Sequence, residues 1–221
     1  MIRISAVEPG SIARELEINP GDYLLSIDGK EIRDYIDYQY GIAADFFVLT
    51  VQKADGEIWE IEIEKDADES LGLLFDDIIF DGLKLCKNDC IFCFVKQQPR
   101  GMRNSLLLKD DDYRFSFLQG SFITLSNLNE EELQRIVELK LSPLYISVHT
   151  TNPALRVEMM KNPRAGRIME QLGYLAGKGI CFHTQLVLCP GYNDGPELDK
   201  SIRDLLSFHP NVLSIGAVPV G

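Results

Sequence analysis

The segment Leu85-Cys86-Lys87-Asn88-Asp89-Cys90-Ile91-Phe92-Cys93-Phe94 holds three of the five cysteines of the chain within eight residues. Their spacing is C-x3-C-x2-C, and no fourth cysteine or histidine lies nearby to complete a tetrahedral site. Because structural zinc sites close with four protein ligands, zinc is the weaker interpretation. Thiolates also bind iron-sulfur clusters, and a four-iron cluster held by three cysteines keeps one iron open for an exchangeable ligand. A further alternative is that the cysteines are small buried side chains without a metal.

This spacing, with the aromatic residue Phe92 before the last cysteine, resembles the cluster signature of the radical S-adenosylmethionine (radical SAM) enzymes. The resemblance implies that Cys86, Cys90 and Cys93 ligate a 4Fe-4S cluster whose open iron binds S-adenosyl-L-methionine (SAM). It also implies an oxidoreductase that cleaves SAM reductively to a 5′-deoxyadenosyl radical, which then acts on an unknown substrate. Such an enzyme needs an electron donor, and we expect one of the flavodoxin or ferredoxin type.

Composition excludes several other classes of protein. The chain of 221 residues is 45% hydrophobic and 25% charged, which is enough for one medium domain or two small ones. Its net charge of −12 argues against a broad binding surface for bulk nucleic acid or for anionic membranes. No segment approaches the roughly 18 apolar residues of a membrane span, and the N-terminus lacks an apolar signal core. Together with cysteines grouped as ligands, this predicts a cytoplasmic protein with no membrane anchor.

Residues 1–70 are predicted to form a small β-rich domain. A turn and helix start at residues 7–13 precede a strand at 23–27, which is closed by the hairpin signal Asp28-Gly29. A second helix is expected within residues 32–44, followed by a hairpin of strands at 46–53 and 57–64. This order resembles bacterial PDZ domains, which implies binding of a peptide or a protein C-terminus by strand addition. The segment 71–75 is either the carboxylate-binding loop of a permuted PDZ domain or a glycine-containing linker strand.

Residues 76–221 are predicted to form an α/β domain, because strands alternate there with amphipathic helices. The expected strands lie at 78–80 with 83–85, at 115–120, at 144–149, at 180–188 and at 212–218. Asn127 or Asn129 is expected to cap a helix, and Asn193-Asp194 with Pro196 is expected to begin another. Joined by right-handed crossovers, these elements give most of a (β/α)6-type partial TIM barrel. The chain looks truncated at its C-terminal end, so we expect the last strand and a C-terminal domain to be missing from it.

The resemblance to radical SAM enzymes also suggests side chains around the cofactor. Gly120 and Ser121 stand where a glycine-rich motif of that family meets the amino group of SAM, and Gln185 stands where a polar residue contacts the cofactor. Ser147 and His149 share one face of a predicted strand and are expected to reach toward the cofactor or the substrate. We treat His149 as the candidate catalytic residue, although a histidine at a strand end is commonly structural.

Three functions therefore remain open from the sequence. The first is a radical SAM enzyme with an N-terminal PDZ-like domain, similar to an uncharacterised bacterial family that also has a C-terminal domain of unknown function. The second is a PDZ-type binding protein whose iron-sulfur cluster is structural or transfers electrons, and the third is a zinc-stabilised scaffold. Reductive cleavage of SAM separates the first from the other two.

Overall fold

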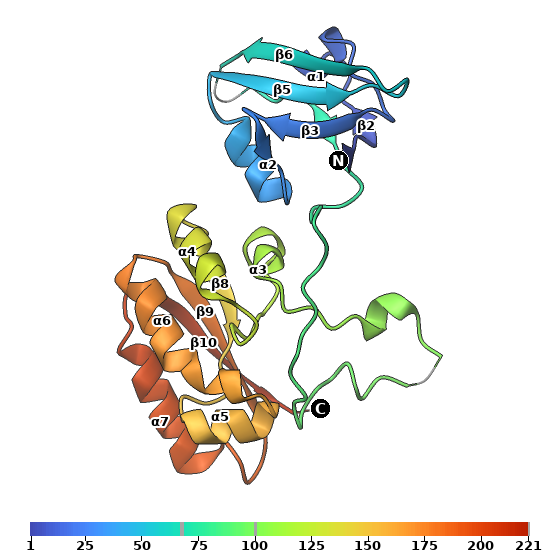
Figure 1. Ribbon diagram of the computed structural model, residues 1–221. Coiled ribbons are helices and arrows are strands. Elements are labelled where there is room, and N and C mark those ends of the chain that lie inside the picture. The colour runs from blue at the N-terminus through green and yellow to red at the C-terminus, as the bar shows by residue number, and fades with distance from the viewer. Residues whose placement is uncertain (67–68, 100, 221) are drawn as a thin grey trace. The chain divides into compact units, whose positions relative to one another are not determined.

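A computed structural model describes residues 1–66, 69–99 and 101–220. The chain divides into two compact units, Met1–Gly82 and Leu83–Gly221, which we call unit 1 and unit 2 (Figure 1). Among the described residues, no helix combines the length and the apolar character that crossing a membrane requires.

Unit 1 is rich in antiparallel β-structure, as predicted. One sheet has the order β1-β3-β5-β6, with β4 paired to the C-terminal end of β3, and a second sheet consists of β2 and β7. Asp28 and Gly29 have φ angles of 49° and 70°, so both adopt the left-handed conformation that the β3–β4 turn requires. The strands are β1 (Ile2–Arg3), β2 (Ala6–Val7), β3 (Tyr23–Ile27), β4 (Lys30–Glu31), β5 (Phe46–Gln52), β6 (Ile58–Glu64) and β7 (Leu73–Leu74), and the helices are α1 (Ile12–Glu15) and α2 (Tyr35–Gly41).

The segment 71–75 is part of unit 1. Its strand β7 pairs antiparallel with β2, and Leu71 and Leu73 are buried in the core. Tyr38 of α2 is also buried, and its hydroxyl accepts a hydrogen bond from the Leu73 backbone amide. Unit 1 continues to Gly82, whereas we predicted its domain to end at residue 70.

Unit 2 is built on a parallel sheet of three strands in the order β10-β9-β8. Helices connect these strands, as expected for βαβ units (Figure 1). The strands are β8 (Leu144–Ser147), β9 (Phe182–Leu188) and β10 (Val212–Pro219). The helices are α3 (Tyr113–Gln119), α4 (Glu130–Glu138), α5 (Pro153–Met160), α6 (Ile168–Gly177) and α7 (Gly195–Leu206), with 3-10 turns η1 (Asn104–Leu107) and η2 (Pro163–Arg167).

The mixed α/β character is confirmed, but the described residues contain no closed barrel. The strand predicted at 78–80 with 83–85 is wrong, because these residues form only isolated bridges, Asp34 with Ile79 and Leu85 with Asp110. The strand predicted at 115–120 is also wrong, because this segment lies in α3. Asp112 accepts the Arg114 amide at the start of α3, and Gly120 ends the helix with a φ angle of 74°. These two capping signals outweigh the alternation of apolar residues between them.

Helix starts with a clear local signal were predicted more reliably. Asn129 is the N-cap of α4, and its exchange of hydrogen bonds with Glu132 completes a capping box. Asp194 is the N-cap of α7, which begins with Gly195 and Pro196. Of the two asparagines proposed for α4, Asn127 instead bonds the backbone oxygen of Leu85.

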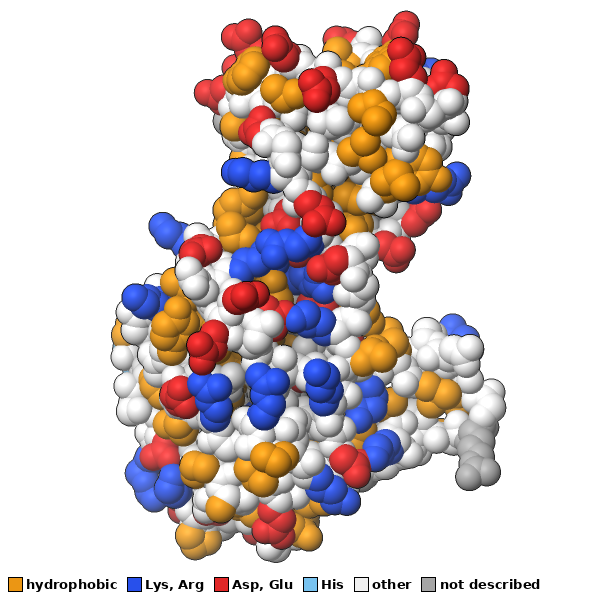
Figure 2. All heavy atoms as spheres, viewed as in Figure 1, with side chains coloured by type: hydrophobic (Ala, Val, Ile, Leu, Met, Phe, Trp, Pro, Cys, Tyr) orange, Lys and Arg blue, Asp and Glu red, His pale blue; other side chains and the backbone are white. Residues whose placement is uncertain are grey.

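The two units carry very different net charges. Unit 1 holds 6 basic and 20 acidic residues, a net charge of −14, whereas the 16 basic and 14 acidic residues of unit 2 give +2. Figure 2 shows Lys and Arg side chains spread across unit 2, interspersed with Asp and Glu. The electrostatic argument from the whole chain therefore applies to unit 1, and unit 2 is close to neutral.

Candidate active site

Cys86, Cys90 and Cys93 line one cavity of about 330 Å³ in unit 2. This volume lies in the range of small-molecule sites, and the carboxyl ends of parallel strands are where α/β proteins bind ligands. Those ends supply Ser147, Val187, Val218 and Pro219, and Gln185 lies in the middle of β9. Much of the remaining wall comes from the segments on either side of η1. The other lining residues are Phe92, Phe94, Val95, Gln97, Leu108, Lys109, Asp110, Asp111, Phe122, Thr124, His149, Val218 and Pro219.

The cysteine loop, residues 85–94, is held against the end of α5. The Asp89 and Ile91 amides donate to the backbone oxygens of Met160 and Met159, both at 2.9 Å. The carbonyl groups of the last helical turn have no partner within the helix, so they are free to accept these bonds. The Cys86 amide donates to the Lys109 oxygen at 2.7 Å. The loop backbone is thus fixed on two sides.

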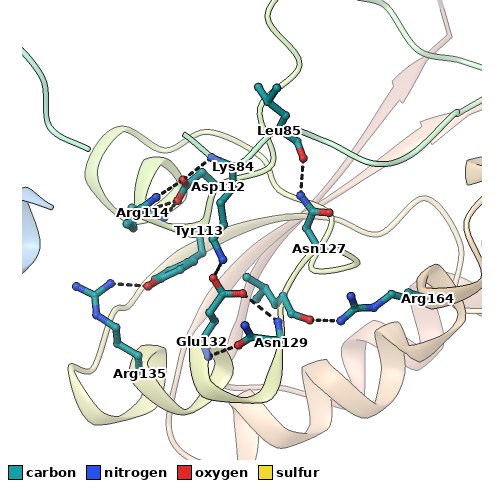
Figure 3. A network of polar contacts seen from close by, with 11 residues as sticks. Lys84, Leu85, Asp112, Tyr113, Arg114, Asn127, Asn129, Glu132, Arg135 and Arg164 are labelled. Carbon is teal, nitrogen blue, oxygen red and sulfur yellow. Dashed lines mark hydrogen bonds and ion pairs between the residues drawn. The ribbon is translucent and has the colours of Figure 1, made fainter. Parts of the chain in front are cut away.

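The chain that enters the cysteine loop is also anchored (Figure 3). The Lys84 amide donates to the Asp112 carboxylate at 3.1 Å, and the Lys84 ammonium group pairs with Glu132 of α4. The Asn127 side chain donates to the Leu85 oxygen at 2.7 Å. Glu132 also belongs to the capping box of α4, so the start of this helix and the entry to the loop share one carboxylate.

The three thiols lie close enough to influence each other electrostatically. Burial raises the pKa of Cys90 to about 12, and the neighbouring Cys86 and Cys93 raise it further, while Lys109 opposes the shift. Burial also raises the pKa of Cys86. Added positive charge in the cavity, such as a bound metal would provide, favours ionisation of Cys86 and Cys90. The other two cysteines, Cys181 and Cys189, do not line this cavity.

The donor set is one that an iron-sulfur cluster can use. In the part of the chain that the structure describes, no three His, Cys, Asp or Glu side chains are arranged so that they could hold a metal ion. A four-iron cluster distributes its thiolate ligands over different irons, so they need not converge on one point. Three free thiols on the wall of one cavity match that requirement.

His149 forms part of the cavity wall as a neutral ring. Its side chain is buried against Phe92, with ring centroids 4.4 Å apart, and its Nδ1 accepts the Val187 amide at 3.2 Å. Burial, and secondarily the charge of Arg156, lowers its pKa to about 3. Because Nδ1 is an acceptor, the single proton of the ring lies on Nε2. His149 therefore offers a hydrogen bond at neutral pH and carries no charge.

Of the cofactor residues suggested by the sequence, two reach the cavity and two do not. Ser147 and Gln185 face each other in the register of β8 and β9, and both line the cavity. Gly120 and Ser121 lie outside the lining, at the end of α3. A Cβ atom on Gly120 would make an ordinary contact with the ring of Tyr145 at 3.4 Å, so the positive φ angle of 74°, not crowding, favours glycine here.

The sequence did not single out Asp111 or Thr124. Asp111 is 2% exposed, and its carboxylate accepts both the amide and the hydroxyl of Thr124 at 2.6 Å. Burial raises the pKa of Asp111. The acidic run 110–112 was the only signal, and it gave no means of separating a cavity residue from Asp112, which caps α3.

Arg156 supplies a buried positive charge next to this wall. Its side chain is 0% exposed, and burial lowers its pKa to about 10. The guanidinium donates to four backbone oxygens from three segments of unit 2. They belong to Thr124 (2.9 Å), Ser147 (2.8 Å), Val148 (2.8 Å) and Ala165 (2.5 Å). Arg156 thus joins the end of β8 to the segment that carries Thr124 and to η2.

Two family models match this chain, and no curated protein does. A model described as a PDZ domain matches residues 3–52, within unit 1. A model described as a Radical SAM-like domain matches residues 65–215, which is more than half of the chain and includes the cysteine loop, β8, β9 and the start of β10. The chain therefore belongs to the radical SAM-like family, with a PDZ domain match at its N-terminus.

Proposed function

We propose that this chain is a radical SAM enzyme, an oxidoreductase with a PDZ-like domain in unit 1 and a radical SAM core in unit 2. The observation that carries the proposal is the cavity of unit 2, where all three cysteines of the C-x3-C-x2-C pattern meet the carboxyl ends of parallel strands. A zinc-stabilised scaffold would have no use for a cavity of this size beside its metal ligands.

In this proposal Cys86, Cys90 and Cys93 hold a 4Fe-4S cluster, and SAM occupies the adjoining space. When bound, the cluster supplies the electron for reductive cleavage of SAM, which yields a 5′-deoxyadenosyl radical that acts on an unknown substrate. The electron comes from a donor of the flavodoxin or ferredoxin type.

The residues of the chain position the cofactor and exclude water. Ser147 and Gln185 offer polar contacts in the cavity wall, and Phe92 contributes an aromatic ring to the same wall. The backbone oxygen of Gln185 accepts the Val148 and His149 amides, which fixes this strand edge. His149 then donates from Nε2 as a neutral ring. Gly120 and Ser121 contribute indirectly, by setting where the following residue, Phe122, meets the cavity.

The decisive experiment is anaerobic reconstitution with iron and sulfide, followed by reduction with dithionite in the presence of SAM. Chromatography should detect 5′-deoxyadenosine and methionine. Cys90→Ser is expected to lose the cluster and the products, whereas Cys181→Ser is the matched control because Cys181 does not line the cavity. A complete cluster that never cleaves SAM would contradict the proposal and favour a structural or electron-transfer cluster.

The match to a PDZ domain model supports a second role, binding of a peptide or a protein C-terminus by unit 1. Titration of the full chain with fluorescent peptides that have free or amidated C-termini tests it. Preference for the free carboxylate is the expected result, and equal or absent binding of both forms would contradict it.

A further inference from the structure

Asn88, in the middle of the cysteine loop, has a side chain whose hydrogen-bonding capacity is fully used. It is 3% exposed, and its Nδ2 atom donates to Cys86 Sγ at 3.4 Å and to Thr124 Oγ1 at 3.0 Å. Its Oδ1 atom accepts from Ser126 Oγ at 2.9 Å and from Asn162 Nδ2 at 2.6 Å. A side-chain amide has two donor hydrogens and two acceptor positions, so all four are satisfied.

The surrounding contacts fix which end of the amide faces the cysteine. The Thr124 hydroxyl has one proton, which it donates to the Asp111 carboxylate at 2.6 Å. It can therefore only accept from Asn88, so the NH2 group must point toward Thr124 and Cys86. No other residue type of this size can donate twice and accept twice in this arrangement.

Asn88 also connects the cysteine loop to distant parts of unit 2. Thr124 and Ser126 belong to the segment between α3 and α4, and Asn162 lies between α5 and η2. The backbone oxygen of Asn88 accepts the Lys109 ammonium group at 2.6 Å. One buried residue thus holds the loop between its first two cysteines, and it does so through contacts that involve no metal.

We propose that Asn88 is a positioning residue that presets the cysteine loop for its cluster and raises the reduction potential of that cluster through the hydrogen bond to Cys86 Sγ. The second half of this proposal rests on the proposed function. Reduction adds negative charge that spreads onto the ligand sulfurs, and an N–H donor stabilises that charge. Hydrogen bonds to sulfur are among the determinants of cluster potential.

The test uses the full chain with three substitutions. Asn88→Leu keeps the branched shape but removes every polar contact of the side chain, and Asn88→Ser is a smaller change whose side chain is too short to reach Cys86. Ser126→Ala is the matched control, because it removes one bond to Asn88 Oδ1 but leaves the donor to sulfur in place.

The first measurement is hydrogen exchange of the metal-free chain. We expect the Asp89 and Ile91 amides to exchange about tenfold faster in both Asn88 variants, the effect of losing one to two net hydrogen bonds, and to change less in Ser126→Ala. Unchanged exchange in both Asn88 variants would overturn the positioning role. This result does not depend on whether a cluster forms.

The second measurement is the reduction potential of the reconstituted chain, followed by electron paramagnetic resonance. We expect the equilibrium constant for reduction to fall about fivefold in the Asn88 variants, which is about 40 mV for one electron. Ser126→Ala should keep the wild-type potential. A wild-type potential in Asn88→Ser would overturn the electronic role, whereas a wild-type chain that assembles no cluster would refute the proposed function and leave the exchange result standing.

Discussion

Replacing Arg156 by methionine is expected to destabilise unit 2 strongly. The side chain is fully buried, and its four hydrogen bonds go to backbone oxygens of three different segments. Methionine fills a similar volume but donates no hydrogen bond, so these oxygens lose their guanidinium partner.

The size of the effect follows from the contacts that remain. The Val148 oxygen keeps the Thr150 amide as a donor at 2.8 Å, so the loss falls on the other three oxygens. Each buried acceptor without a partner costs about 1–3 kcal/mol. Part of this cost is offset because methionine need not hold a charge away from water. We therefore expect a net loss of about 3–5 kcal/mol, a large part of the ~5–15 kcal/mol typical of a domain.

Urea unfolding of the full chain can separate the two units. Trp59 is the single tryptophan and lies on β6 of unit 1, so its fluorescence reports unit 1. Far-ultraviolet circular dichroism reports mainly unit 2, because the longer helices lie there. Arg156→Met should move the dichroism transition and leave the fluorescence transition in place.

Arg164→Met is the matched control, since this arginine is exposed and makes one bond, to the Leu128 oxygen at 2.7 Å. We expect it to cost less than about 1 kcal/mol. An Arg156→Met loss equal to that of the control would refute the reasoning, because the buried bonds would then contribute no more than a surface contact.

Three further predictions concern single side chains. Gly72→Ala should destabilise unit 1 by roughly 3 kcal/mol, measured by tryptophan fluorescence, because its Cβ would lie 2.2 Å from Ser11 Cβ at a φ angle of +83°. His149→Gln should remove a pH dependence of the free energy of unfolding. Folding lowers the pKa of this ring from 6.5 to about 3, so between these pH values the unfolded state binds a proton and the folded state does not. Wild-type stability then falls as the pH drops from 6.5 toward 3, by up to about 1.4 kcal/mol per pH unit. Glu132→Ala should cost about 1–2 kcal/mol by calorimetry, because it removes both the capping box and the ion pair with Lys84.

Each of these changes has a control. Gly56→Ala also meets a positive φ angle, but its Cβ would enter open space, so an equal loss in both glycine variants would argue against the steric explanation. His183→Gln is the matched substitution, because it also removes a histidine but outside the cavity lining. A stability difference between wild type and His149→Gln that does not change with pH would contradict the linkage argument. Glu132→Gln keeps a side chain that can cap the helix, so it should lose less than Glu132→Ala.

Local signals in the sequence predicted a large part of this structure. The Asp28-Gly29 turn and the Asn129 cap of α4 depend on contacts within a few residues, and the start of α7 after Asp194 is marked by Pro196 in its first turn. The same kind of signal could have corrected the strand predicted at 115–120, since Asp112 and Gly120 mark the two ends of a helix. The alternation of apolar residues in between was given too much weight, because so short a run fits either type of element.

The sequence by itself determined the elements that depend on neighbours along the chain and, through the cysteine spacing, the family. Only the tertiary structure decided which polar residues share the cavity and which charge is buried beneath it. Asp111 and Asp112 are adjacent and chemically identical, yet one lines the cavity and the other caps a helix. From the sequence Arg156 would be taken for a surface arginine, but in the structure it is buried and bonds four backbone oxygens. The physical reason is that the hydrogen bonds of caps and turns join residues close in sequence. The burial of a side chain, and the meeting of several side chains in one cavity, instead depend on how distant segments pack together.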